Sequence, residues 1–474
     1  MIKNEREYRI TLARAAEFER SLEAARQRTT SGLPSRIAQA QVDALLGQLE
    51  ELRAELAEYE ALKSGKRKVL DLVSLEELPR ALIESRIAAG LTQKDLAQRL
   101  GIPEQQVQRY EATEYAGASL ARIQEIVRAL GLNIRKEVFL PTVDVSTQAL
   151  TQRLQASGLD ANFFTRRLFG ETAEENDSAT ALKSAGLLSR VFGWMPSDLF
   201  AGTAPLLPQA EALGAQFKLP ENANESRTAV YAIYARFVAG LTLKAVPAPN
   251  KAIPRDAQQL RNEIVQAFGE ITLESVLAYL WEHGVPVIPL EENGGFHAAC
   301  WRMEGRNAIV LKQKTDSEAR WLHDLLHEVY HIAGSPESPD FAYIEQGLGP
   351  FERRDTDEEK EATAYAADVL LKGQAEAMVK ECVNLTKGKI PKFKSVVPEI
   401  AERHQVSVGA LANYIAWRLS LQGRDWWGAA TNLQEHSEEE PLKRTRAFLF
   451  ERLDWSKLER RDQDLLIQAF AENR

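Results

Sequence analysis

The sequence has few cysteines and no long apolar run. Only Cys300 and Cys382 occur in 474 residues, too few for a disulfide framework and without the spacing of a structural zinc site. No apolar stretch approaches the length that crosses a bilayer, and residues 1–5 do not begin a signal peptide. We therefore expect a cytoplasmic protein without a membrane partner, in which both thiols lie in the core.

An excess of basic charge is also missing. The chain has 59 Lys and Arg against 68 Asp and Glu, a net charge of -9, which argues against a general affinity for nucleic acid or anionic membranes. Hydrophobic residues at 44% and charged residues at 27% are ordinary for a globular protein. The length predicts three or four domains, and no internal repeat or low-complexity tract is present.

One short run carries the strongest chemical signal. His327, Glu328 and His331 form the pattern H-E-x-x-H, within an apolar stripe that runs from Trp321 to Ile332. On a helix, positions i and i+4 share a face, so both imidazoles can bind one metal ion while Glu328 acts as general base. His323 is about 12 Å from His331 along such a helix and cannot bind the same ion with both others. The pattern predicts a catalytic zinc site.

A third protein ligand must come from elsewhere, because a catalytic zinc takes three protein groups and a water. Glu361 opens an alanine-rich segment whose small residues allow close packing against the motif helix. Glu337 completes metzincin-like spacing, but it lies in a serine- and proline-rich stretch that reads as an extended loop. Glu358 and Asp357 are further candidates. We favour Glu361 as the third ligand.

A second pattern lies between residues 78 and 134. A helix, a glycine turn and a second helix occupy 86–103, and Glu104 to Glu111 would form a recognition helix. Gln93 can reach a phosphate, while base edges would be contacted by Gln105, Gln106, Gln108 and Arg109. Seven Lys and Arg against six Asp and Glu give this segment a balance of only +1. Specific DNA binding is therefore expected rather than a strong non-specific affinity, although a small helical bundle used for protein contacts fits the same pattern.

Upstream, an apolar seam alternates spacings of three and four residues. Its members are Val42, Leu45, Leu49, Leu52, Leu56 and Tyr59. A second apolar stripe runs from Tyr8 to Ala25, and a turn is expected at 29–35. The segment either closes on itself as a hairpin or pairs with a second subunit as a short coiled coil, and the second alternative predicts a homodimer.

Both patterns resemble known families. The segment 78–134 is similar to the Xre-type helix-turn-helix domain. His327-Glu328-x-x-His331 followed by Glu361-Ala362-x-x-Tyr365-Ala366 resembles the ImmA/IrrE family of bacterial metallopeptidases, over roughly 265–420. Short strands expected at 284–289, 298–303 and 307–311 fit that family, whereas Thr363 stands where it usually has asparagine.

We expect a mainly α fold with a small α+β, zincin-like metallopeptidase domain. The predicted domains are a helical hairpin or coiled coil at 1–77, an Xre-type helix-turn-helix at 78–140, a helical middle region and linker at 141–250, the metallopeptidase domain at 251–430 and a helical tail at 431–474.

The resemblance implies a DNA-binding transcriptional regulator with a zinc-dependent endopeptidase that cleaves a repressor or partner protein in a stress or phage-related response. Zn2+, or another divalent metal, would be held by His327, His331 and Glu361, with Glu328 as the catalytic base. We expect the substrate strand to lie along an edge strand near residues 309–311. The alternative is a non-proteolytic repressor, or the antitoxin of a toxin, whose metal domain only binds or senses. The expected partners are the protein's own operator DNA and a repressor or toxin.

Overall fold

The computed structural model describes residues 1–28, 35–65, 70, 72, 75–132, 134, 139–170, 177–206, 223–248, 251–292, 296–334, 340–346, 357–437 and 439–471. The chain forms two compact units. Unit 1 comprises Met1–Leu150, Glu174–Gly186 and Glu459–Arg461, and unit 2 comprises Thr151–Ala173, Leu187–Leu458 and Asp462–Arg474. Among the described residues, no helix is both long and apolar enough to span a membrane.

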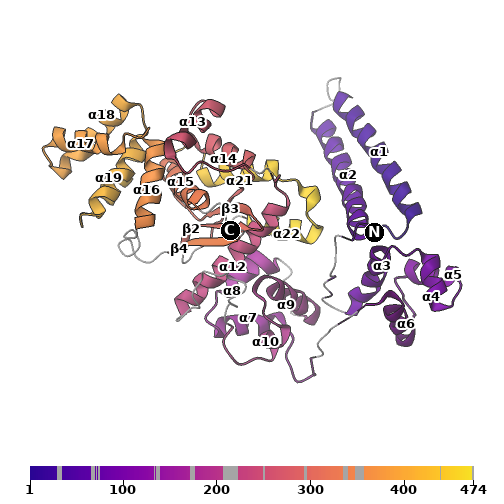
Figure 1. The fold of residues 1–474 in the computed structure, drawn as a ribbon. Helices are drawn as coiled ribbons and strands as arrows, with labels where there is room; N and C mark the ends of the chain where they lie inside the picture. The colour runs from indigo at the N-terminus through magenta and orange to yellow at the C-terminus, as the bar shows by residue number, and fades with distance from the viewer. Residues whose placement is uncertain are drawn as a thin grey trace. The chain divides into compact units, whose positions relative to one another are not determined.

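Unit 1 begins with an antiparallel pair of helices, α1 (Glu5–Arg28) and α2 (Ser35–Lys63) (Figure 1). The seam of α2 packs against α1 of the same chain, so that Leu49 is only 2% exposed. Ion pairs between the helices, such as Arg53 with Glu19 at 2.7 Å, flank this contact. The two helices pack together within one chain, so the seam no longer argues for a homodimer, which stays a prediction. The turn expected at 29–35 lies almost wholly outside the described residues.

The helix-turn-helix follows in the same unit. Thr92 caps the second helix through a capping box with Asp95, and Gly101 ends it in a left-handed conformation with φ of 64°. The hairpin and this bundle share one apolar core, in which Leu56 of α2 belongs to the same cluster as Leu82 and Leu96. The predicted boundary at 77 thus crosses a continuous core. The elements are η1 (Leu75–Glu77), α3 (Leu78–Ala88), α4 (Gln93–Leu100), α5 (Glu104–Ala112) and α6 (Leu120–Leu130).

The middle region is helical, as expected from its sequence. Its elements are α7 (Thr147–Ala156), α8 (Ala161–Phe164), η2 (Thr165–Phe169), α9 (Ser178–Phe192), α10 (Pro196–Phe200) and α12 (Ala223–Lys244). The last of these helices packs on strands of the sheet, and Arg306 of the sheet donates hydrogen bonds to the carbonyl oxygens of Val246 and Pro247 just beyond it. The predicted boundary at 250 therefore separates α12 from the sheet that it covers.

Unit 2 is built around a four-stranded sheet with the order β1-β3-β2-β4. Strand β3 pairs in parallel with β1 and antiparallel with β2, and β2 pairs antiparallel with β4. The three strands predicted from the sequence are present, whereas β4 was not predicted. Residues 309–311 lie in β3, which has a neighbour on each side, so the expectation of a substrate strand beside them is wrong. The strands are β1 (Val287–Pro289), β2 (Phe296–Met303), β3 (Arg306–Leu311) and β4 (Phe341–Gln346).

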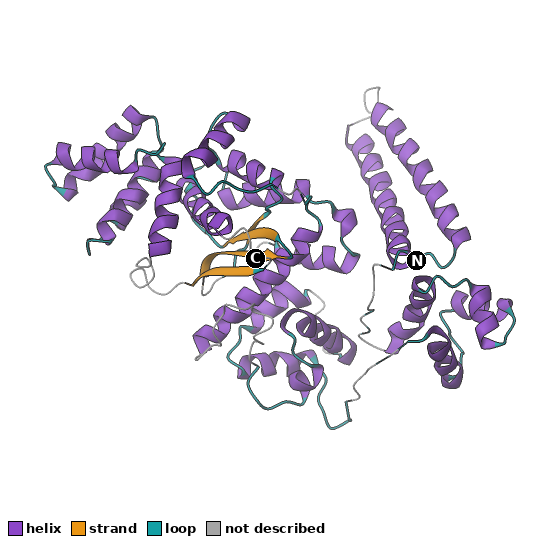
Figure 2. Ribbon diagram, viewed as in Figure 1, coloured by secondary structure: helices purple, strands orange, loops and turns teal. Residues whose placement is uncertain are grey.

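Helices cover both faces of the sheet, with α15 (Glu318–Gly334) on one side and α12 on the other (Figure 2). Trp321, Leu325 and Val329 of α15 are completely buried on this side. Helix α16 (Asp357–Leu370) lies along α15. The same core is closed by α13 (Ala257–Phe268) and α14 (Leu273–Glu282).

The C-terminal helices complete unit 2. Helices α17 to α20 surround a second apolar cluster. Helix α21 packs against β1 and α14, where Arg444 bridges Glu274 at 2.5 Å and Glu318 at 2.7 Å, so the tail is part of this unit. These elements are α17 (Ala375–Thr386), η4 (Ile390–Lys392), α18 (Phe393–His404), α19 (Val408–Ser420), α20 (Trp427–Thr431), α21 (Pro441–Arg452), η5 (Trp455–Lys457) and α22 (Arg460–Ala469).

Candidate functional site

The two motif histidines lie on one face of α15, as the spacing requires. His327 and His331 are each 5% exposed, and their Nε2 atoms are 3.3 Å apart. A carboxylate from α16 completes the group, since Oε2 of Glu359 lies 3.1 Å from Nε2 of His327. One ligand atom from each of the three residues lies within 4.8 Å of the other two.

Two of the three separations fit a bound metal ion. Two ligands at about 2.05 Å from zinc, at the tetrahedral angle, are about 3.3 Å apart. The observed 3.3 Å and 3.1 Å lie close to that value. Two imidazole nitrogens and one carboxylate oxygen are also a donor set that zinc accepts, so the residues present fit this ion.

The carboxylate beside the imidazoles is Glu359 and not Glu361, which we favoured from its sequence. Two residues along a helix correspond to a rotation of about 200°, and the two side chains meet α15 at different residues. Glu361 is exposed and accepts a hydrogen bond of 2.5 Å from the hydroxyl of Tyr330. Sequence spacing alone did not show which carboxylate of the acidic first turn faces α15.

The other candidates occupy different places. Oε1 of Glu358 lies 3.3 Å from Nδ1 of His331, on the side of the ring away from Nε2. Asp357 pairs weakly with Lys360 at 3.9 Å, and Glu337 lies outside the described residues. Nδ1 of His323 lies 3.3 Å from Asp324, and this histidine is not a member of the metal-binding group.

The outer nitrogens of both histidines also have neighbours. Oγ1 of Thr363 lies 3.5 Å from Nδ1 of His327, and Glu358 occupies the equivalent position at His331. The ring of Tyr343, on β4, stacks on His331 with centroids 3.6 Å apart. Groups at the outer nitrogen fix the tautomer and the ring orientation of metal-binding histidines. Burial, followed by the nearby His327, lowers the pKa of His331 to about 3, so its imidazole is neutral at pH 7.

Glu328 is completely buried, beside Cys300 of β2. Burial first, and then the charge of Glu328 and a hydrogen bond to it, raise the pKa of the Cys300 thiol far above its ordinary value. The thiol therefore stays protonated and faces the carboxylate. Both cysteines are buried and free, as predicted.

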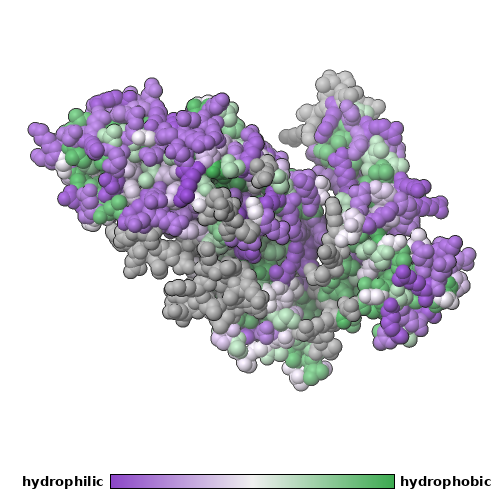
Figure 3. Space-filling view, viewed as in Figure 1, coloured by the Kyte–Doolittle hydropathy of each residue, from purple (hydrophilic) through white to green (hydrophobic). Residues whose placement is uncertain are grey.

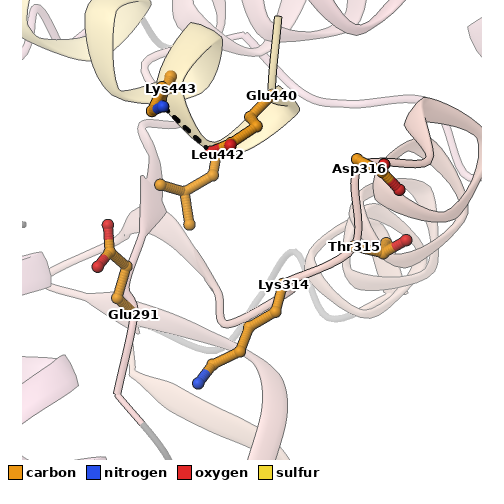
Figure 4. A pocket seen from close by; sticks show the side chains of 7 residues that line it. All are labelled: Glu291, Lys314, Thr315, Asp316, Glu440, Leu442 and Lys443. Atoms are coloured by element: carbon orange, nitrogen blue, oxygen red, sulfur yellow. Dashed lines mark ion pairs between the residues drawn. The ribbon is translucent and has the colours of Figure 1, made fainter. Parts of the chain in front are cut away.

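A pocket of about 650 Å³ lies away from the histidines, between α21 and the segments that follow β1 and precede α15 (Figure 4). Its charged residues already have partners: Asp316 is 2.7 Å from His436, and Glu440 is 3.5 Å from Lys443. Charged side chains of both signs line it, so the pocket does not favour a ligand of one charge. The lining residues are Glu291, Lys314, Thr315, Asp316, Glu440, Leu442 and Lys443.

The second candidate site is the surface of α5 in unit 1. Gln105, Gln108 and Arg109 are exposed on this helix, as a recognition helix requires. Gln106 is half-buried, and its amide donates to the hydroxyl of Tyr110 at 2.9 Å. Base contact by Gln106 would therefore require this hydrogen bond to be exchanged.

A buried ion pair supports α5, and we had not predicted it. Arg86 of α3 donates to both carboxylate oxygens of Glu111, at 2.5 and 2.8 Å, and these side chains are 3% and 0% exposed. The amide of Gln93 also donates to Glu111 at 2.8 Å, which orients this residue at the start of α4. The sequence contained a signal for this ion pair, because Arg86 and Glu111 are charged residues on the buried faces of their helices.

Comparison with protein families matches residues 82–136 to the model described as helix-turn-helix. This part of the chain is therefore an Xre-type helix-turn-helix domain, and the match indicates a DNA-binding transcriptional regulator. Comparisons with curated proteins and with solved structures found no match.

Proposed function

We propose that this protein is a transcriptional regulator whose second unit is a zinc-dependent endopeptidase. The helix-turn-helix at 82–136 supports DNA binding. The group formed by His327, His331 and Glu359 carries the peptidase half of the proposal. Resemblance of the motif to the ImmA/IrrE family supports a repressor or partner protein as the substrate, and the cytoplasm as the place where it is cleaved.

The donor set suits catalysis as well as binding. When bound, a zinc ion supplies a positive charge that polarises the scissile carbonyl and makes a water acidic near pH 7. Two neutral histidines and one carboxylate cancel only part of that charge. Thr363 would hold the ring of His327 with Nε2 directed toward the ion.

Glu328 would act as general base and then as general acid. It follows His327 directly, so a change of its side-chain rotamer would bring its carboxylate to the metal-facing side of α15. There it would take a proton from the attacking water and pass it to the departing amine. The thiol of Cys300 would hold the carboxylate in its buried orientation until then.

The outer edge of strand β4 would bind the substrate peptide. It is an outer strand of the sheet, paired only with β2 among the described residues. Its Tyr343 stacks on His331, so this edge runs beside the metal-binding group. An extended peptide would add to β4 through main-chain hydrogen bonds, in place of the position near 309–311 expected from the sequence.

A second candidate function is a repressor or antitoxin whose metal domain only binds or senses. The complete burial of Glu328 favours it, because a carboxylate enclosed beside Cys300 does not reach a water in the resting state. The partner would then be held without being cut.

Replacing Glu328 by glutamine separates these functions. Parent and Glu328→Gln proteins are produced in cells, and newly formed peptide amino termini are labelled and identified. A peptidase generates ends that are absent with the variant, although the variant retains its metal and fold. Glu361→Gln, a matched change on α16, should generate the parent's ends. Identical ends from parent and Glu328→Gln would contradict the peptidase and favour the binding function.

A further inference from the structure

Four lysines gather where α17 ends and α18 begins. Lys387, Lys389, Lys392 and Lys394 are all exposed, and residues 382–398 contain no Asp or Glu. In a chain with a net charge of -9, this lysine surface is a marked local reversal of charge.

Local structure opposes a lysine at three of these positions, although the C-terminal end of α17 favours the charge of Lys387. Lys387 adopts a left-handed backbone conformation with φ of 53°, which suits glycine better than any residue with a side chain. Lys392 is the N-cap of α18 and Lys394 lies in its first turn, where the helix macrodipole disfavours cations. Residues that break local rules without a structural gain are often retained for function.

The lysines are also not neutralised by their surroundings. The nearest acidic residues in sequence are Glu381 and Glu399, and both are paired with Arg403, while Glu381 also contacts His404 at 2.9 Å. Among the residues that the structure describes, no ion pair involves Lys387, Lys389, Lys392 or Lys394. Their charge, added to the positive end of α18, is directed to solvent.

We propose that the lysine surface binds the phosphate backbone of duplex DNA, an inference that rests on the DNA-binding function of the helix-turn-helix. Non-specific affinity scales with the number of phosphates neutralised, and the segment 78–134 has a balance of only +1. The lysine surface supplies the charge that this segment lacks. Because both belong to one chain, DNA held by either is presented to the other at a high effective concentration.

An acidic protein is the competing occupant. Leu385, near the end of α17, is 52% exposed, and a protein partner would cover such a side chain. Figure 3 shows mainly hydrophilic residues over α17 and α18, around a small hydrophobic area. The absence of Asp and Glu between residues 382 and 398 and the small charge balance of the segment 78–134 favour DNA, and the test below distinguishes the two occupants.

The test compares two triple variants of the full chain. One carries Lys389→Gln, Lys392→Gln and Lys394→Gln. Its control carries the same change of charge at three exposed lysines elsewhere: Lys251→Gln, Lys443→Gln and Lys457→Gln. Binding to a promoter duplex and to an unrelated duplex of equal length is measured at several salt concentrations. Log affinity falls with log salt, and each phosphate contact increases the magnitude of that slope by about 0.9, so the first variant should reduce this magnitude by about 2 to 3 for both duplexes. The control should keep the slope of the parent.

Lys387→Gly removes a charge and relieves backbone strain together. It should reduce the magnitude of the salt slope of DNA affinity by about 1, while the thermal midpoint stays equal or rises. A loss of DNA affinity would then not reflect unfolding.

Arg109→Ala should instead weaken preference for the promoter duplex. If the lysine variants bind DNA as the parent does, the proposal is overturned, whether or not they lose an acidic protein. If the parent binds neither duplex, the DNA-binding function itself fails.

Discussion

The buried pair between Arg86 and Glu111 should decide the stability of unit 1. Replacing Glu111 by glutamine keeps its shape but leaves the guanidinium of Arg86, which is 3% exposed, without a counter-charge. Removing one partner of a buried ion pair costs roughly 3 to 5 kcal/mol. Because glutamine still accepts one hydrogen bond, we expect the lower value, about 3 kcal/mol. For a unit of this size, that lowers the melting temperature by roughly 6 to 12 °C.

The positions of the tryptophans make this effect measurable in the full chain. All eight tryptophans lie in unit 2, so their fluorescence reports on that unit, whereas far-ultraviolet circular dichroism reports on both. In Glu111→Gln, part of the dichroism signal should melt early while the fluorescence transition stays in place. Glu125→Gln is the control, because its pair with Arg122 is exposed and is worth about 1 kcal/mol at most.

Replacing the ion pair by an apolar contact should restore the stability that Glu111→Gln loses. The double variant Arg86→Met with Glu111→Leu replaces the pair by side chains of similar volume, which is often neutral or stabilising. It should melt close to the parent temperature but bind promoter DNA less well, since Gln93 loses the carboxylate that orients it. Equal melting of Glu111→Gln and Glu125→Gln would refute the reasoning about this pair.

Three further changes test other parts of the structure. Thr363→Val removes the hydroxyl beside Nδ1 of His327 and should weaken metal affinity by about tenfold, with recovery in Thr363→Ser, as measured by chelator competition; unchanged affinity in Thr363→Val would exclude an orienting role. Leu49→Ala should destabilise unit 1 by about 2 to 5 kcal/mol without changing the fluorescence transition, and a loss below 1 kcal/mol would show that the seam is not packed in solution. Arg109→Ala should cost about 1 to 3 kcal/mol in promoter binding and relax sequence preference, in a mobility-shift assay; unchanged preference would remove α5 as the recognition helix.

Periodic and motif signals predicted much of this fold. The apolar seam that includes Leu49, the glycine turn within 86–103 and the three strands before α15 each depend on local spacing, and each is present in the structure. Strand β4 was missed because it follows a stretch rich in serine and proline, which was interpreted as a loop. Its pairing with β2 is a long-range contact that no local pattern encodes.

The candidate site was predictable only in part. Because His327 and His331 are four residues apart, they lie on one face of a helix whatever surrounds them. Glu359 was not among the candidates considered, because the carboxylate that meets the histidines depends on the rotation of α16 about its own axis, and packing against α15 sets that rotation. The stacking of Tyr343 on His331 depends on β4, and so it could not be anticipated.

Metal content of the purified full chain tests the central claim most directly. The parent should contain close to one zinc or similar divalent ion per chain by elemental analysis. His327→Ala, His331→Ala and Glu359→Ala should each lose it, and Glu361→Ala should keep it, because the carboxylate of Glu361 accepts a hydrogen bond from Tyr330 and is not part of the metal-binding group. A parent without metal, or histidine variants with undiminished metal, would contradict the account, and loss in Glu361→Ala but not in Glu359→Ala would return the third ligand to Glu361.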